Sequence, residues 1–200
     1  MDTQKASRVM LVLAAFLSGL VLFFGAILFI TGRAPSPIGP AIAAVGGPFH
    51  LEDQNGKPVS DTDMKGRPFL VFFGFTHCPD VCPTTLFDIS EIMRKLGKDA
   101  DRTGALFITV DPERDTPPAL KDYLASFDPH LRGLTGDPPA VEAALKAYRV
   151  FAKKVPLQGG DYTMDHTAVV YLMDKDGRFV APFNLKRTPE AAAEELRRYL

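Results

Sequence analysis

One segment limits the possible folds of this chain more than any other: the uninterrupted apolar run Phe-Leu-Val-Phe-Phe-Gly-Phe at residues 69–75. Its length is that of a strand. A strand without polar side chains on either face is typical of the centre of a sheet that is covered on both sides. A short loop and then a helical pattern follow it. The sequence therefore predicts a layered α/β domain built around this strand.

Strand and helix patterns alternate along the chain from residue 49 onward. Turns at residues 53–56 and 174–177 lie between short apolar segments and predict two hairpins. Residues 105–110 predict a second buried strand. Helical patterns, each beginning with a proline, occupy residues 83–96, 117–127, 138–148 and 189–200. This order predicts an α/β thioredoxin-like fold, in which a central mixed sheet is flanked by helices and extended by an N-terminal hairpin.

The N-terminal part of the chain carries a second long apolar segment. Residues 10–30 contain no charged side chain, and about 21 residues are enough for a helix to cross a hydrocarbon core of about 30 Å. A cleaved signal peptide is the alternative, with Ala-Ile-Ala at residues 41–43 as a cleavage-like site. Signal peptides, however, usually have an apolar region of only about 7–15 residues. The sequence therefore favours a retained transmembrane helix.

The charges that flank this segment predict its orientation. Lys5 and Arg8 precede it, whereas Arg33 alone follows it closely, which favours a cytoplasmic N-terminus. Nine residues before the span are too few for a transit peptide, so we expect a bacterial inner membrane. We therefore expect a single-pass protein with its C-terminal domain in the periplasm. The predicted parts are a cytoplasmic N-terminus (1–9), an anchor (10–30), a Gly- and Pro-rich linker (31–48) and the thioredoxin-like domain (49–200).

The two cysteines of the chain, Cys78 and Cys82, follow the first central strand. In open α/β sheets, ligand sites form at this place. Pro83 is expected at the first helical position, so that Cys82 opens the helix and its thiol pKa is lowered by backbone N–H groups and the helix dipole. Three intervening residues allow either a disulfide or a metal ion shared by both sulfurs.

A third candidate, His166, lies far downstream and is expected to begin the strand at residues 168–173, beside the strand that leads to the cysteines. Two thiolates and one imidazole suit a thiophilic metal ion, with Cu(I) as the leading candidate. Structural zinc usually takes four protein ligands, and only three good ones are present. The two thiols alone also suit dithiol–disulfide chemistry. On the residues alone, a metal site, a redox site and a plain surface histidine all stay open.

Other polar residues give weaker predictions. His77 is expected to pack or to meet solvent, because adjacent side chains at a strand end point in opposite directions. Asp80 is either a turn residue or a group that tunes the thiols, and Asp165 could orient His166. Met164 is a minor thioether candidate for the same metal.

Two further histidines and one charged loop complete the candidates. His50 and His130 lack a partner cluster in the sequence and are expected at the surface. The charged loop is interpreted either as a capping and salt-bridge cluster at the start of the next helix or as a docking surface for a partner protein; its members are Asp111, Glu113, Arg114 and Asp115.

Three motifs together resemble the Sco/SenC family. They are Gly-Phe-Thr-His-Cys-Pro-Asp-Val-Cys-Pro at residues 74–83, Val-Asp-Pro-Glu-Arg-Asp-Thr-Pro at 110–117 and Asp-His-Thr at 165–167. The resemblance covers residues 46–200 and implies a thioredoxin-like domain that binds copper through Cys78, Cys82 and His166. It also implies a role in assembling the dinuclear copper centre of cytochrome c oxidase subunit II.

The resemblance further implies a copper chaperone rather than an enzyme, with subunit II and an upstream copper donor protein as partners. The alternative is a thiol–disulfide oxidoreductase that reduces the target cysteines before copper enters, or a copper or redox sensor. A net charge of -1 gives no reason to expect a nucleic-acid partner.

Overall fold

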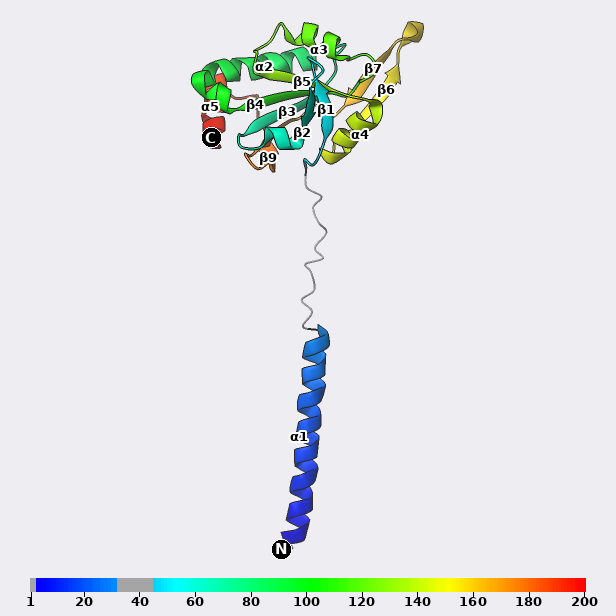
Figure 1. Cartoon of the computed structure of the whole chain (residues 1–200), viewed down its shortest axis with the longest axis vertical. Helices are drawn as coiled ribbons and strands as arrows, with labels where there is room; N and C mark the ends of the chain where they lie inside the picture. The colour runs from blue at the N-terminus through cyan, green and yellow to red at the C-terminus, as the bar shows by residue number, and fades with distance from the viewer. Residues whose placement is uncertain (1–2, 32–44) are drawn as a thin grey trace. The chain divides into compact units, whose positions relative to one another are not determined.

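The computed structural model describes residues 3–31 and 45–200 (Figure 1). Its contacts divide the chain into two units, Met1–Ala43 and Ala44–Leu200, which are described separately. The first unit contains helix α1 (Thr3–Thr31), which includes the predicted anchor at residues 10–30. Within the described residues, no helix combines the length and the apolar character that crossing a bilayer requires. Most of the predicted linker falls on residues 32–44, outside the described part, as do residues 1–2 of the predicted cytoplasmic segment.

The second unit is built around a mixed sheet with the strand order β2-β1-β5-β4-β3-β8-β9. Strands β3, β4 and β5 run parallel, whereas the strands at either side pair antiparallel. The predicted mixed sheet and N-terminal hairpin are therefore confirmed. The strands are β1 (His50–Asp53), β2 (Pro58–Ser60), β3 (Phe69–Gly74), β4 (Gly104–Thr109), β5 (Leu131–Thr135), β8 (Val170–Met173) and β9 (Phe179–Pro182).

Four helices of this unit lie close to their predicted positions: α2 (Val81–Leu96), α3 (Pro117–Leu124), α4 (Pro138–Ala147) and α5 (Pro189–Arg197). Prolines occupy the first turns of α3, α4 and α5, and the capping oxygens come from Thr116, Asp137 and Thr188. Helix α2 ends at Leu96 and is followed by the cap residue Gly97, whose φ of 59° places it where a side chain is disfavoured.

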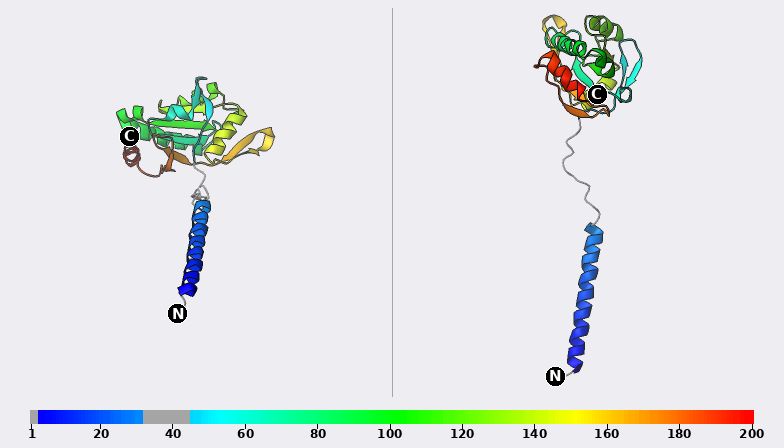
Figure 2. Two further views of the ribbon diagram at one scale, coloured as in Figure 1. Left: turned by 60° about the horizontal axis from the view of Figure 1, so that its bottom comes forward. Right: turned by 90° about the vertical axis from the view of Figure 1, so that its left-hand side faces the viewer.

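Aromatic side chains show which helices cover which face of the sheet. Phe72 and Phe107 share one face, where the Phe107 ring lies 5.9 Å from Tyr123, at the end of α3. Helix α2 covers the same face and packs against α5. Phe73 points to the opposite face and meets Tyr148, the residue that follows α4, at 5.3 Å. Figure 2 shows the helices on both sides of the strands. All residues of β3 and β4 are consequently buried.

A separate hairpin, β6 (Ala152–Pro156) with β7 (Tyr162–His166), was not expected from the sequence. It pairs antiparallel, with Ala152 opposite His166, and forms a two-stranded sheet of its own. The Gly-rich stretch at residues 158–160 is its turn, where Gly159 and Gly160 have φ of 87° and 86°. Figure 1 shows the hairpin extending beyond the main sheet. Four of the five β6 residues are exposed, so no apolar alternation marked this strand.

Candidate functional site

The two cysteines lie at the junction between β3 and α2. Helix α2 begins at Val81, two residues earlier than predicted, so Cys82 is its second residue and Pro83 its third. The backbone N–H of Cys82 donates to the sulfur of Cys78 at 3.4 Å. The N–H of Cys78 in turn donates to the carbonyl oxygen of Phe75 at 3.2 Å. The first turn of the helix thus holds the Cys78 sulfur beside Cys82.

His166 comes to this junction from the hairpin, not from the strand that was predicted. It is the last residue of β7, whereas the predicted strand, β8, begins at Val170. Its Nε2 lies 3.8 Å from the Cys82 sulfur, and its ring meets the edges of Phe72 and Phe75. Its Nδ1 lies 3.2 Å from the carbonyl oxygen of Thr167. Because a carbonyl only accepts, that contact places the ring proton on Nδ1 and leaves the Nε2 lone pair toward Cys82.

The environment of Cys82 overturns the prediction of a lowered thiol pKa. Both cysteines are free, Cys82 is 0% exposed and Cys78 is 9% exposed. Burial raises the pKa of the Cys82 thiol strongly, and the neighbouring Cys78 adds to this rise. Withdrawal from water therefore outweighs the favourable position in the first helical turn. Without a bound metal ion, Cys82 is a protonated thiol at neutral pH.

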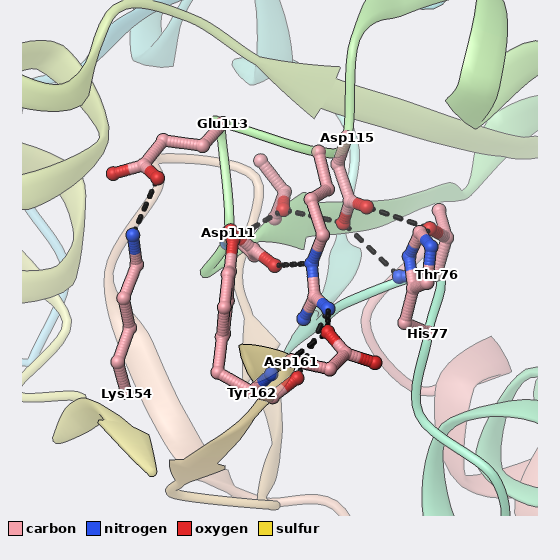
Figure 3. A network of polar contacts seen from close by, with 10 residues as sticks. Thr76, His77, Asp111, Glu113, Asp115, Lys154, Asp161 and Tyr162 are labelled. Atoms are coloured by element: carbon pink, nitrogen blue, oxygen red, sulfur yellow. Dashed lines mark hydrogen bonds and ion pairs between the residues drawn. The ribbon is translucent and has the colours of Figure 1, made fainter. Parts of the chain in front are cut away.

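A polar cluster joins the loop after β4 to the hairpin (Figure 3). The buried carboxylate of Asp111 accepts from Arg114 Nε at 2.5 Å and from the Tyr162 hydroxyl at 2.9 Å. Arg114 also donates from Nη1 to the carbonyl oxygen of Tyr162 at 3.0 Å, and its guanidinium lies 3.8 Å from the centre of the Tyr162 ring. We call Asp111, Arg114 and Tyr162 the Arg114 cluster. The ion pair between Arg114 and Asp111 is a salt bridge of the predicted kind. The cluster, however, contacts β7, and the cap of the following helix comes from Thr116.

Asp115 links the cysteine loop to the same region. It accepts from the hydroxyl of Thr76 at 2.6 Å, from the N–H of Thr76 at 3.0 Å and from the Thr109 hydroxyl at 2.7 Å. Burial raises the pKa of Asp115, although these hydrogen bonds act in the opposite direction. Since Thr76 is two residues before Cys78, Asp115 fixes the start of the cysteine loop. The sequence placed Asp115 in a loop interpreted as a capping and salt-bridge cluster or as a docking surface, and neither interpretation connected it to the cysteine loop.

The weaker candidates His77, Asp80 and Asp165 do not point at the sulfurs of the two cysteines in any hydrogen bond of the described residues. His77 is exposed, as expected, with Nδ1 3.0 Å from the Thr76 hydroxyl. Asp80 occupies the N-cap position of α2 but its side chain caps nothing. Asp165 is exposed, and the carbonyl of Thr167 takes the place next to His166 that was considered for Asp165.

The remaining histidines lie away from the cysteines. His50 is exposed, as expected. The prediction that His130 has no partner is wrong, because its ring nitrogens lie 2.6 Å from Asp128 and 3.1 Å from Asp101. Neither carboxylate was identified from the sequence. Asp101 is 29 residues away along the chain, so its approach to His130 follows only from the fold.

A hollow of about 320 Å³ opens between the cysteine loop and the hairpin, with Cys78, Asp80, Met164 and His166 in its wall. Within the described part of the chain, no three His, Cys, Asp or Glu side chains already stand together as a metal site. A metal ion bonded to one thiolate at about 2.3 Å and one imidazole at about 2.0 Å holds sulfur and nitrogen about 3.5–3.7 Å apart. The observed 3.8 Å between the Cys82 sulfur and His166 Nε2 is close to this separation, so this pair of donors would need only a small adjustment.

Comparisons with known proteins place the chain among members of one family. The SCO1/SenC family model matches residues 39–200. The SCO2-like protein of Rickettsia conorii is 41% identical over 155 residues, which are 76% of this chain and 76% of that protein. The structure of Bradyrhizobium japonicum ScoI with copper bound is 68% identical, with a TM-score of 0.77, over 78% of this chain and 100% of that one. BsSco, a Sco-family cytochrome c oxidase assembly protein with an identified disulfide switch, is 27% identical, with a TM-score of 0.61, over 78% of this chain and 93% of its own.

Proposed function

Because this chain belongs to the SCO1/SenC family, we propose that it binds one copper ion through Cys78, Cys82 and His166. The observation that carries the proposal is the 3.8 Å approach of His166 Nε2 to the Cys82 sulfur, from a strand that begins 80 residues further along the chain. The copper-bound relative that is 68% identical supports it.

The chemistry of the three donors supports copper over other metals. Two thiolates and one imidazole form a soft, three-coordinate set that suits Cu(I), whereas magnesium and calcium prefer oxygen donors. Structural zinc usually takes a fourth protein ligand. Two additional candidates suit Cu(I) less well, because the His77 ring faces the Thr76 hydroxyl and Asp80, which lines the same hollow, offers a harder oxygen donor.

The role we propose is delivery of copper, without catalytic turnover, during assembly of cytochrome c oxidase. The recipient is the dinuclear copper centre of subunit II, and an upstream protein supplies the copper. The description of BsSco as an oxidase assembly protein supports this role. We further propose that residues 10–30 anchor the protein in a bacterial inner membrane with the domain in the periplasm. The absence of charge in that segment, with Lys5 and Arg8 before it, supports the anchor and its orientation.

Copper binding by single variants tests the ligand set. The full chain should bind one copper ion, and its Cu(II) form should show a thiolate-to-metal absorption band. Cys78→Ser and Cys82→Ser should abolish the band, and His166→Ala should weaken binding at least about tenfold. His77→Ala is the matched control, because it removes a neighbouring histidine that does not face the sulfurs, and it should bind as the wild type does. A His166→Ala protein with unchanged copper affinity would refute the three-ligand site.

A second function, thiol–disulfide exchange that reduces the target cysteines, is favoured by one observation: the Cys78 sulfur lies 3.4 Å from the backbone nitrogen of Cys82, and both thiols are free. The raised pKa of Cys82 counts against it, since the thiolate is the attacking species. Oxidase assembly in cells that carry His166→Ala separates the two functions. A reductase retains activity in this variant, whereas a copper donor loses it.

A further inference from the structure

We propose that Arg114 is a positioning residue that, through the Arg114 cluster, holds the β6–β7 hairpin where His166 reaches Cys82. This inference rests on the proposed copper site and names what keeps its third ligand in place. Arg114 itself contacts neither sulfur nor imidazole in any hydrogen bond or ion pair of the described residues. Its hydrogen bonds are with Asp111 on one side and with Asp161 and Tyr162, at the beginning of β7, on the other.

The hairpin needs such a contact because it has little apolar surface to bury. Four of the five residues of β6 are exposed, and in β7 no residue is fully buried. Arg114 contributes a hydrogen bond to the Tyr162 carbonyl at 3.0 Å and covers the Tyr162 ring at 3.8 Å. Tyr162 opens the strand that His166 ends, so a group that fixes Tyr162 also fixes the path of the imidazole.

The other end of the cluster is attached to the rigid core. Asp111 is 1% exposed, and its N–H donates to the Thr109 hydroxyl at 2.9 Å. Thr109 donates in turn to Asp115, which holds Thr76 at the start of the cysteine loop. One continuous set of hydrogen bonds therefore runs from the cysteine loop through the end of β4 to the hairpin. The cysteine loop and the hairpin that carries His166 are thus both attached to the buried carboxylates of this set.

The ion pair of Arg114 with Asp111 is more deeply buried than the ion pair between Lys154 of the hairpin and Glu113. The Arg114 side chain is 18% exposed and its carboxylate partner is fully buried, so its charged hydrogen bonds are little screened. Lys154 and Glu113 are 44% and 58% exposed, and ion pairs of this kind contribute little. The geometry therefore assigns the positioning role to Arg114.

The test compares Arg114→Met with Arg132→Met in the full chain in detergent. Arg132 is the matched control, because it also pairs with a buried carboxylate, that of Asp53 at 2.8 Å, but from β5 in the main sheet. Three quantities are measured: hydrogen exchange at the amides of β7 in copper-free protein, release of Cu(I) to bathocuproine disulfonate, and the nitrogen couplings in the electron paramagnetic resonance spectrum of the Cu(II) form.

Arg114→Met should speed hydrogen exchange along β7, release Cu(I) about tenfold faster and lose nitrogen coupling while it keeps the thiolate absorption band. Arg132→Met should change none of these, even where both variants melt at similarly reduced temperatures. Tyr162→Phe, which removes only the hydroxyl bond to Asp111, should give a smaller change in the same direction as Arg114→Met.

The outcomes separate this inference from the proposed function. Unchanged β7 exchange in Arg114→Met overturns the positioning role whether or not copper binds. Faster exchange with unchanged copper release and nitrogen coupling also overturns it, because the hairpin would then move without consequence for His166. If the wild type binds no copper, the proposed function fails, while faster exchange in Arg114→Met still supports Arg114 as the group that holds the hairpin.

Discussion

The packing beneath Cys82 leads to a specific prediction for Gly74→Ala. Gly74 ends β3, and its φ is one that any residue adopts, so alanine introduces no backbone strain. A Cβ there would lie 2.7 Å from Phe107 Cε2, 2.8 Å from the Cys82 sulfur and 3.2 Å from Phe72 Cε1. Carbon contacts are most favourable at about 3.5–4.0 Å, so the neighbours must give way by roughly 0.8 Å.

The expected cost follows from the rigidity of those neighbours. Phe72, Phe107 and Cys82 are all within 1% of complete burial, so none has free space to move into. Overpacking of such a core costs about 1–3 kcal/mol. For a domain of this size, about 2 kcal/mol lowers the melting temperature by about 4–8 °C. Ligand geometry tolerates shifts of only about 0.5 Å, so displacement of the Cys82 sulfur should also weaken copper binding about tenfold or more.

Calorimetry of the full chain and competition with a Cu(I) chelator measure the two effects. Gly133→Ala is the control, because its Cβ would lie 2.6 Å from Leu124 Cδ1 on the same face of the sheet but away from the cysteines. It should lower the melting temperature by a comparable or smaller amount and leave copper affinity unchanged. A Gly74→Ala protein that melts as the wild type does refutes the packing argument. Lower stability with wild-type copper affinity refutes the link between this packing and the site.

Three further predictions concern single groups. The pKa of His130 is raised, because hydrogen bonds to two carboxylates outweigh the opposing effect of burial. The resulting stabilisation is complete below about pH 6.5 and is lost as pH rises through the folded pKa, so urea unfolding should show His130→Gln destabilised at about pH 6 and little changed at about pH 9. In copper-free protein, iodoacetamide should modify Cys78 at least about tenfold faster than Cys82, as peptide mass spectrometry will show, because burial shields Cys82 and raises its pKa. Tyr123→Phe removes a buried hydroxyl that has no partner among the described residues, and it should raise the free energy of unfolding by about 1 kcal/mol.

The elements that were predicted correctly carry their signal in neighbouring residues. Strands β3 and β4 are continuous apolar runs, and the prolines and caps of α3, α4 and α5 lie at their ends. Strand β5 was not predicted, because Arg132 and Gly133 interrupt its apolar pattern. The arginine is tolerated there because Asp53, on the adjacent strand β1, accepts two hydrogen bonds from it. A compensation between residues 79 positions apart cannot be read from local spacing.

In the candidate site, too, the features that depend on neighbouring residues were predicted, whereas those that depend on distant residues were not. Cys78 and Cys82 were identified as candidates from their spacing after a buried strand, and α2 begins two residues before the predicted position. The strand assigned to His166 was wrong, because the hairpin that carries it is exposed and has no alternating pattern. The lowered pKa predicted for Cys82 failed for a related reason. Position in a helix can be inferred from sequence, whereas burial of the sulfur depends on how α2 packs against Phe72 and Phe107 of the sheet.

The three candidate donors are thus held by interactions of different strength. Cys82 belongs to the hydrophobic core between β3 and α2, and moving it means repacking buried phenylalanine rings. His166 is held by a two-stranded hairpin whose attachment depends on hydrogen bonds and on one guanidinium over a ring. Local opening free energies follow the amount of buried apolar contact, so we expect the hairpin to open more readily than the cysteine junction. Separation of His166 from the cysteines then breaks the polar cluster and the ring contacts with Phe72 and Phe75, while the two sulfurs keep their places.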